Sequence, residues 1–279
     1  MHETISIENM IRLYDMKLRK TWVDKKLMVF DLDGTLTETK SAISPDMSQS
    51  LSLLLNQKNI AIIGGGSYKQ FKIQLLSQLA CRRTLLSRLF LFPTTATSFY
   101  RYSSGWKKIY RHELSKKERV DIKKAFREVL KEINYVPPKK TYGVVIEDRG
   151  TQVTFSVFGQ DIVKVLGKKG VEMKKKWTKE HTPLKLEIAR LVQKKLPHVE
   201  ARAAGYTSID VSKKGIDKGY GLYQIEKKLN IKIKDMLFIG DAIFKGGNDY
   251  AVVKTGIDYV RVAGPRETKK VIEYITKKV

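Results

Sequence analysis

Short apolar runs alternate with amphipathic segments over the first third of the chain. The expected elements before residue 95 are a strand at 27–30, a helix from Ser44-Pro45, a strand at 59–63, a helix near 68–79 and a strand at 89–93. Ser44 suits a helix N-cap and Pro45 the first helical turn. An alternation of strands and helices predicts a parallel sheet with helices on its faces. The segment 5–20 also has helical spacing, but it suggests no function.

The pattern changes after Pro93. Paired strands are expected near 97–112, a helix begins at the capping box Ser115/Glu118, and a hairpin turns at 148–150. A further helix is expected at 184–195 and a single strand at 201–212. The strand–helix pattern then resumes, with helices from 217 and from 267 and strands at 236–241 and 259–264. We therefore predict a discontinuous α/β core, residues 1–94 and 212–279, with an inserted α+β cap with an antiparallel sheet at 95–211.

Four predicted strand or helix ends of the core carry polar groups. They are Asp31-Leu32-Asp33-Gly34-Thr35, Gly64-Gly65-Gly66-Ser67, Lys218, and Asp241 with Asn248 and Asp249 behind it. Ligands of open parallel sheets bind beyond the carboxyl ends of the strands. These groups are therefore expected to meet at one site.

Phosphoryl transfer is the chemistry that these residue types suggest. Asp31 can act as a nucleophile that forms an aspartyl phosphate, while Asp33 gives and takes a proton. Mg²⁺ ligated by Asp31, the Asp33 backbone carbonyl and Asp241 would offset the repulsion between the carboxylates. Ser67 and the glycine amides can bind phosphoryl oxygens, and Lys218 can neutralise charge.

Each of these residues also has a plainer interpretation. A lone D-x-D is often a turn, a glycine run is often only a tight turn, and Asp241 could be a helix cap. Lys218 is one of many lysines. Their occurrence together, in this order and at element ends, favours a catalytic site.

The segments "DLDGT", "GGGS", "DKGYGL" and "GDAIFKGGNDY" resemble the four motifs of the haloacid dehalogenase superfamily of aspartate-nucleophile phosphotransferases. The resemblance covers nearly all of the chain after residue 25, and the insertion resembles the class IIB cap. Within that class the chain is most similar to eukaryotic-type phosphomannomutases, through "TSIDVSKKGIDKGYGL" and "GGNDY". The resemblance implies a Rossmannoid core, Mg²⁺, a metal-supporting Asp249, and contacts of Ser208 and Asp210 with the sugar or its phosphate.

The chain departs from the phosphomannomutase pattern where that family binds the distal phosphate with arginines. Arg149 matches the first cap arginine, although a solvent-exposed hairpin tip is the alternative interpretation. Gln160 and Gly167 occupy the positions of the second and third, and Lys40 that of a substrate-facing arginine near the nucleophile. A neutral glutamine cannot replace the charge of a guanidinium.

Lys168 and Lys169 follow in sequence and are candidates to compensate as point charges. A weakened distal clamp favours hydrolysis over transfer. The prediction is therefore a Mg²⁺-dependent phosphatase of sugar phosphates or similar small phosphomonoesters, with the cap setting specificity. Phosphomannomutase is the alternative enzyme.

Charge and composition add the remaining expectations. The net charge is +25, which fits a solvated lysine-rich surface or a field that attracts phosphorylated substrates better than a nucleic-acid footprint. A non-catalytic anion or nucleic-acid binder stays as an alternative of another class. The apolar runs are too short for a membrane span, and there is no secretory signal. Cys81 is the only cysteine, which fits a reducing cytoplasm, and a homodimer through the cap is a candidate assembly.

Overall fold

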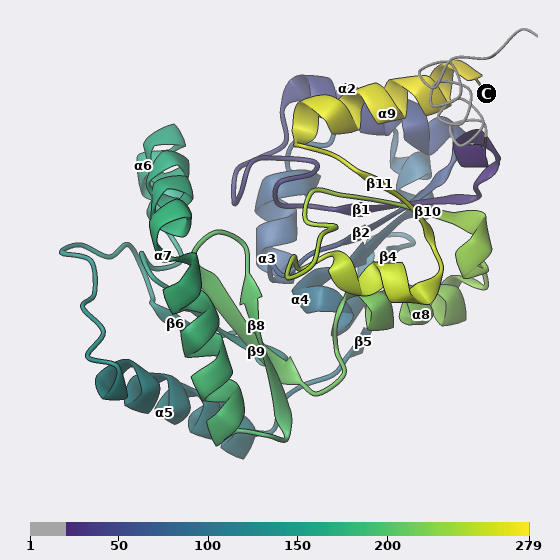
Figure 1. The fold of residues 1–279 in the computed structure, drawn as a ribbon. Helices are drawn as coiled ribbons and strands as arrows, with labels where there is room; N and C mark the ends of the chain where they lie inside the picture. The colour runs from purple at the N-terminus through teal and green to yellow at the C-terminus, as the bar shows by residue number, and fades with distance from the viewer. Residues whose placement is uncertain (1–20, 279) are drawn as a thin grey trace, which may run out of the picture.

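The computed structural model describes residues 21–278, so the helix expected at 5–20 lies outside the described residues. Two sheets organise the chain (Figure 1). A seven-stranded sheet has the order β11-β10-β1-β2-β3-β4-β5, and a four-stranded sheet has the order β6-β7-β9-β8. The parallel core and the additional antiparallel sheet confirm the predicted α/β fold with a cap.

The centre of the large sheet is parallel and buried. Its strands are β1 (Leu27–Asp31), β2 (Asn59–Ile63), β3 (Leu89–Phe92), β10 (Met236–Gly240) and β11 (Asp258–Arg261). All five residues of β1 are buried, and β1 pairs in parallel with both β10 and β2. Strands with helices on both faces need apolar side chains on both, which explains the unbroken apolar runs in the sequence.

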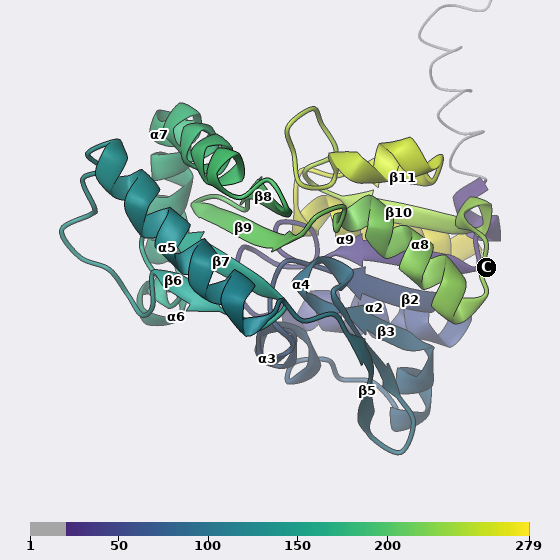
Figure 2. The same cartoon turned by 90° about the horizontal axis from the view of Figure 1, so that it is seen from below.

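Alternate residues of β1 contribute to separate apolar cores. Met28 and Phe30 pack under α2 (Pro45–Gln57) and α9 (Pro265–Lys278), whereas Leu27 and Val29 face α8 (Lys218–Leu229). Figure 2 shows α8 on the opposite face of the sheet from α2 and α9. The predicted cap of α2 is confirmed, because the Ser44 hydroxyl accepts a hydrogen bond from Met47 N. Short elements between these are α3 (Tyr68–Phe71), η1 (Lys72–Leu76), η2 (Arg83–Arg88), α4 (Pro93–Ala96), η3 (Ile233–Asp235) and η4 (Tyr250–Thr255).

The four-stranded sheet has one apolar and one polar face. Its strands are β6 (Ile146–Asp148), β7 (Gln152–Ser156), β8 (Val199–Ala204) and β9 (Ser208–Lys213). Side chains alternate between faces along a strand. Val153, Phe155, Ile209 and Val211 pack against helices α5 (Lys116–Glu132) and α7 (Lys168–Lys195). Their polar neighbours therefore point to the other face, which is turned towards the core.

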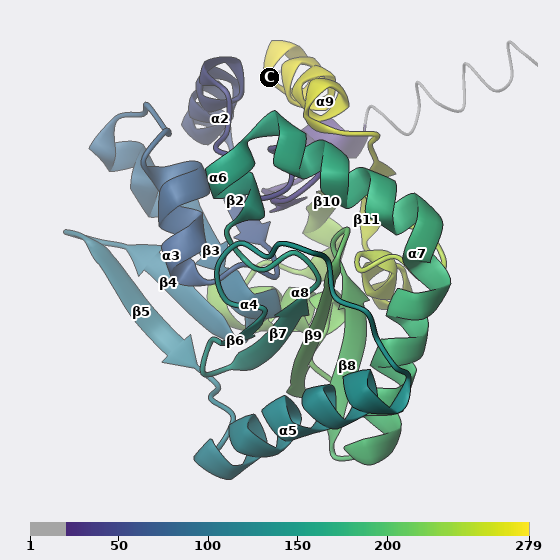
Figure 3. The same cartoon turned by 90° about the vertical axis from the view of Figure 1, so that its left-hand side faces the viewer.

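Three details of the cap differ from the sequence-based expectation. Strands β4 (Ser98–Tyr102) and β5 (Trp106–Arg111) extend the large sheet, although residues 95–111 were assigned to the cap. The single strand expected at 201–212 is a hairpin of β8 and β9. The helix expected at 184–195 is the last part of α7, which is kinked at His181 two residues before Pro183, and the short α6 (Ile162–Leu166) precedes it. Figure 3 shows α7 running alongside the cap sheet.

The lysine-rich helices do not resemble membrane spans. Within residues 21–278 no helix combines the length and the apolar character that crossing a bilayer requires.

Close packing of α8 on the core gives the first prediction. A Cβ added at Gly221 would lie 2.3 Å from Ile63 Cδ1 and 3.0 Å from Ala96 Cβ. Gly221→Val should therefore lower the free energy of unfolding by about 1–3 kcal/mol, measured by urea denaturation. Gly105→Ala is the control, because an added Cβ there meets no heavy atom within 4 Å. Equal stability of the two variants would contradict this packing.

Candidate active site

Three strand and helix ends bring the predicted acidic residues together. Asp31 ends β1, Asp241 directly follows the neighbouring β10, and Asp249 lies eight residues beyond. One carboxylate oxygen from each of the three can be chosen so that all lie within 4.8 Å of one another. The rule that ligands bind at the carboxyl ends of parallel strands therefore located this cluster correctly.

Lys218 lies between two of these acids. It is the first residue of α8, whose N-cap Asp217 accepts a hydrogen bond from Tyr220 N. The Lys218 ammonium donates to Asp31 Oδ1 at 2.5 Å and to Asp249 Oδ1, and all three side chains are buried. Burial alone would lower the pKa of Lys218, but the carboxylates of Asp249 and Asp31 outweigh it and raise that pKa, so the ammonium stays charged.

Three carboxylates lie around one buried ammonium, which contacts two of them. Burial raises the pKa of Asp31 well above its ordinary value, Lys218 opposes the rise, and Asp249 and Asp241 add to it. Burial and Asp249 likewise raise the pKa of Asp241. The cluster therefore carries more negative charge than its own residues neutralise.

The donor set fits a magnesium ion. Asp31 Oδ2 is buried and has no hydrogen-bond partner among the described residues, so it is free to bind a cation or to attack an electrophile. Carboxylate oxygens are the ligands that Mg²⁺ prefers. Asp31 and Asp241 would ligate the ion, with Asp249 beside them; Asp249 is itself held by a hydrogen bond from Ala242 N to its Oδ2.

Gly34 allows the Asp31–Thr35 turn to approach Asp241. Its φ is +96°, and a Cβ added there would lie 2.5 Å from Asp241 Oδ2. Glycine meets both requirements, since it has no side chain and adopts positive φ without strain. The Thr35 hydroxyl donates to Asp241 Oδ1 at 3.4 Å.

Asp33 is oriented by the backbone N–H of Lys40 and by Gln74, a residue without a role in the sequence-based prediction. Its Oδ1 accepts hydrogen bonds from Lys40 N at 2.5 Å and from Gln74 Nε2 at 2.9 Å. Gln74 lies in η1, a π-helical turn that interrupts the helix expected at 68–79. Such turns are often found at functional sites. A glutamine within an apolar helical face was the one available signal.

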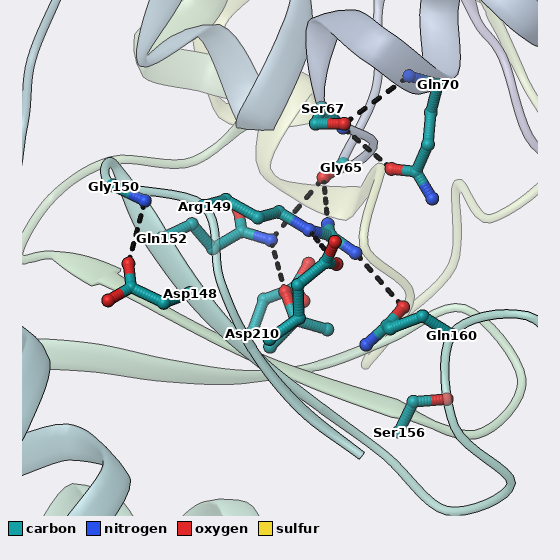
Figure 4. Close-up of polar contacts among 12 residues, drawn as sticks. Gly65, Ser67, Gln70, Asp148, Arg149, Gly150, Gln152, Ser156, Gln160 and Asp210 are labelled. Carbon is teal, nitrogen blue, oxygen red and sulfur yellow. Dashed lines mark hydrogen bonds and ion pairs between the residues drawn. The ribbon is translucent and has the colours of Figure 1, made fainter. Parts of the chain in front are cut away.

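Ser67 follows the predicted glycine loop, and its hydroxyl takes part in a helix cap. Its hydroxyl accepts from Gln70 N and caps α3, while Gln70 Oε1 accepts from Ser67 N (Figure 4). Gly65 and Gly66 line the cleft above Asp31, whereas Ser67 is not among the residues that line it. Ser67 thus caps α3, and its predicted contact with phosphoryl oxygens stays a prediction.

Arg149 bridges the cap and the core, so the solvent-exposed interpretation of this residue is wrong. Its side chain is 4% exposed and donates to Glu147 Oε2 at 2.7 Å and to Gly65 O at 2.7 Å. It also donates to Gln160 Oε1 at 3.2 Å (Figure 4). Lys40 donates to the same oxygen at 2.5 Å, so Gln160 joins two cations.

The remaining predicted substrate residues line the same cleft. Ser208 and Asp210 project from β9, and Asp210 Oδ1 accepts a hydrogen bond from the Thr154 hydroxyl at 2.8 Å. Removal from water raises the pKa of Asp210. The cleft between cap and core has a volume of about 430 Å³, within the range of sites for small molecules.

The structure does not place the expected compensating lysines in the cleft. Lys168 and Lys169 are exposed at the start of α7 and do not line it. Lys174 and Lys185, further along the same helix, are buried and do. Among so many lysines, sequence alone offered no signal for these two.

Comparison with known proteins identifies the family. The family model described as haloacid dehalogenase-like hydrolase matches residues 28–278. The chain therefore belongs to the haloacid dehalogenase-like hydrolases, as its motifs predicted.

Curated relatives are named phosphomannomutases. The chain is 25% identical over 264 residues to the phosphomannomutase of Encephalitozoon cuniculi. The match covers 92% of this chain and 95% of the relative. It is 26% identical over 260 residues to that of Drosophila melanogaster, with coverages of 90% and 96%. The predicted resemblance to phosphomannomutases is thus confirmed as a resemblance.

Solved structures with the same fold are named as a nucleotidase and a phosphatase. IMP-bound Plasmodium falciparum IMP-nucleotidase matches with a TM-score of 0.68 at 16% identity, over 98% of this chain and 74% of the other. Aspergillus fumigatus trehalose-6-phosphate phosphatase matches with a TM-score of 0.52 at 17% identity, over 94% and 97%. At these identities the matches show the fold.

The acidic cluster gives the second prediction. Because Mg²⁺ would relieve repulsion among three carboxylates, it should raise the melting temperature of the wild type. At a concentration 100-fold above Kd the stabilisation is about 2.7 kcal/mol. Asp241→Asn should lose most of this shift, whereas Asp46→Asn, on the exposed surface of α2, should keep it. A shift of the same size in both variants would place the metal elsewhere.

Proposed function

We propose that the protein is a Mg²⁺-dependent phosphatase of sugar phosphates or similar small phosphomonoesters, acting through an aspartyl phosphate on Asp31. The observation that carries this proposal is the unpartnered, buried Asp31 Oδ2 at the floor of the cleft, with Oδ1 fixed by Lys218. One oxygen is thus oriented while the other is available for attack on phosphorus.

The chain's own residues supply the other parts of the reaction. Asp31 Oδ2 attacks phosphorus, and the bond from phosphorus to the leaving oxygen breaks. Asp33, whose Oδ1 is oriented by Lys40 N and Gln74, protonates that oxygen and then removes a proton from the water that hydrolyses the aspartyl phosphate. Lys218 offsets the negative charge of nucleophile and phosphoryl group. When bound, Mg²⁺ would screen the charge between carboxylates and phosphate.

The comparisons support a phosphate ester as substrate. The family is one of hydrolases, and the structural neighbours include a nucleotidase and a sugar-phosphate phosphatase. The curated relatives are named for a sugar-phosphate mutase. A small phosphorylated substrate is common to these names, and the cleft volume suits one.

Phosphomannomutase activity is the second candidate, favoured by the named relatives. Gln160 argues against it as the main reaction. This residue presents one amide oxygen, already shared by Lys40 and Arg149, where a mutase needs a charged fork to retain a bisphosphate. Water should therefore usually reach the aspartyl phosphate before a second sugar hydroxyl does.

Three further expectations rest on sequence. The single cysteine suits a cytoplasmic protein, and a homodimer through the cap stays a prediction. Non-catalytic binding of anions or nucleic acid is disfavoured, because Asp31, Lys218 and Asp241 are all present at one site.

The third prediction tests the nucleophile. Asp31→Asn should fold but lose activity on the order of 10⁴-fold or more towards phosphorylated metabolites with Mg²⁺, measured by phosphate release. Asp46→Asn should match the wild type. An Asp31→Asn protein with near-wild-type turnover would refute the mechanism.

The fourth prediction separates the two reactions. With glucose 1-phosphate and a bisphosphate activator, the wild type should release phosphate faster than it forms the 6-phosphate. Gln160→Arg should shift the product ratio towards the 6-phosphate by about tenfold, because a charge-assisted fork retains the bisphosphate longer. Gln160→Met, neutral and similar in length, should not shift it. Clean isomerisation by the wild type would make the mutase the correct function.

A further inference from the structure

The turn that follows β3 has an unusual backbone. Thr94, Thr95 and Ala96, within α4, have φ values of +50°, +54° and +62°, which lie in the left-handed region. This region is unfavourable for residues with a side chain, and threonine, branched at Cβ, is among the least suited to it. Glycine would adopt the same turn without this cost. The cost must therefore be offset by what the backbone and the side chains of the turn contact.

Hydrogen bonds hold the backbone of the turn against the glycine loop. Thr94 N donates to Gly66 O and Thr95 N donates to Gly64 O, both at 2.9 Å. Figure 2 shows α4 on the side of the large sheet that faces the cap. Thr95 lines the cleft together with Gly65 and Gly66. The turn is thus fixed beside the space that a substrate would occupy.

Two of the three side chains have a structural use. The Thr94 hydroxyl is buried and forms a hydrogen bond with the Thr97 hydroxyl, and Ala96 is buried in the apolar core under α8. Thr95 is only half-buried, and its hydroxyl forms no hydrogen bond with any of the residues 21–278. A strained residue that leaves its polar group unpaired at a cleft is typical of a functional position.

The strand order indicates which part of a substrate Thr95 would meet. Asp31 ends β1, and β2 separates β1 from β3. The turn follows β3 and is bonded to Gly64 beyond β2, so it lies between one and two strand spacings, roughly 5–10 Å, from the end of β1. A phosphoryl group at Asp31 has Lys218 and the glycine-loop amides as donors. Thr95, further out, is left to the leaving group.

We propose that Thr95 determines specificity by forming a hydrogen bond with a hydroxyl group of the leaving alcohol. A threonine hydroxyl both donates and accepts, so it suits another hydroxyl, and it brings no charge that would select an anion. The preferred substrates are then phosphomonoesters of polyols, such as sugars, rather than of alcohols without further hydroxyl groups. This inference rests on the proposed function for the position of the phosphate at Asp31.

The experiment measures binding rather than turnover. Glucose 1-phosphate, mannose 1-phosphate and ribose 5-phosphate carry hydroxyl groups, whereas cyclohexyl phosphate has a six-membered ring with none. Their Kd values are measured by calorimetry on full-length Asp31→Asn protein with Mg²⁺. Added to that background, Thr95→Val removes the hydroxyl and keeps the branched shape, and Thr95→Ser keeps the hydroxyl. Ala96→Gly is the matched control, because it eases the neighbouring left-handed residue and leaves Thr95 unchanged.

We expect at least one of the three sugar phosphates to bind about fivefold or more tighter than cyclohexyl phosphate. Thr95→Val should weaken that sugar phosphate by about 3–10-fold, the loss expected for one hydrogen bond, and should change the Kd of cyclohexyl phosphate by less than about twofold. Thr95→Ser and Ala96→Gly should stay within about twofold of their parent for both ligands.

A stability measurement separates this role from a structural one. Thr95→Gly relieves the left-handed strain and removes the side chain. It should therefore melt at or above the temperature of its parent while it loses the same preference for the sugar phosphate. A residue needed only for the fold would lower the melting temperature when removed.

Three outcomes would overturn the inference. In the first, no sugar phosphate is preferred over cyclohexyl phosphate. In the second, Thr95→Val weakens both kinds of ligand by the same factor, which would assign the residue to the phosphoryl group or to the fold. In the third, the preference survives in both Thr95→Val and Thr95→Gly. Failure of the proposed function is recognised separately, because it appears as absent phosphate release by the wild type and does not enter these Kd ratios.

Discussion

The ion pairs of Lys218 with Asp31 and Asp249 are the interaction on which the site depends. Three carboxylates converge at the edge of a buried sheet, and a single buried ammonium separates two of them. Removing the ammonium would leave two buried, unpaired acids, a change that typically costs several kcal/mol. The same pairing leaves Asp31 with one fixed and one free oxygen, which is what a nucleophile requires.

The core of the fold could be predicted from sequence because its rules are local or topological. Apolar runs such as Leu27–Phe30 must be buried on both faces, and the acids behind them must meet at the carboxyl edge of the sheet. Asp31, Asp241 and Lys218 were located in this way. Strands β4 and β5 were assigned to the cap because alternation predicts that they pair with each other but does not tell which sheet they join; β4 pairs with β3, and β5 pairs with β4.

The cap was harder to predict because its function depends on which of many similar residues are buried. Lys168 and Lys169 were the natural candidates by sequence position, yet they are exposed, whereas Lys174 is buried against the cleft. A kinked 28-residue helix determines that difference. Gln74 was missed for a related reason, since a π-helical turn rotates its side chain towards Asp33 in a way that regular periodicity does not reveal.

Core and cap thus have separate roles in the proposed account. The core supplies the nucleophile, the proton donor and the acidic cluster, and the polar face of the cap sheet with α7 supplies contacts that select the substrate. The most direct test is to quench the enzyme during turnover and reduce acyl phosphates with borohydride, followed by peptide mass spectrometry. The account predicts substrate-dependent conversion of Asp31 to homoserine, with Asp33 and Asp241 unchanged. Hydrolysis without conversion of Asp31, or conversion at another acid, would contradict it.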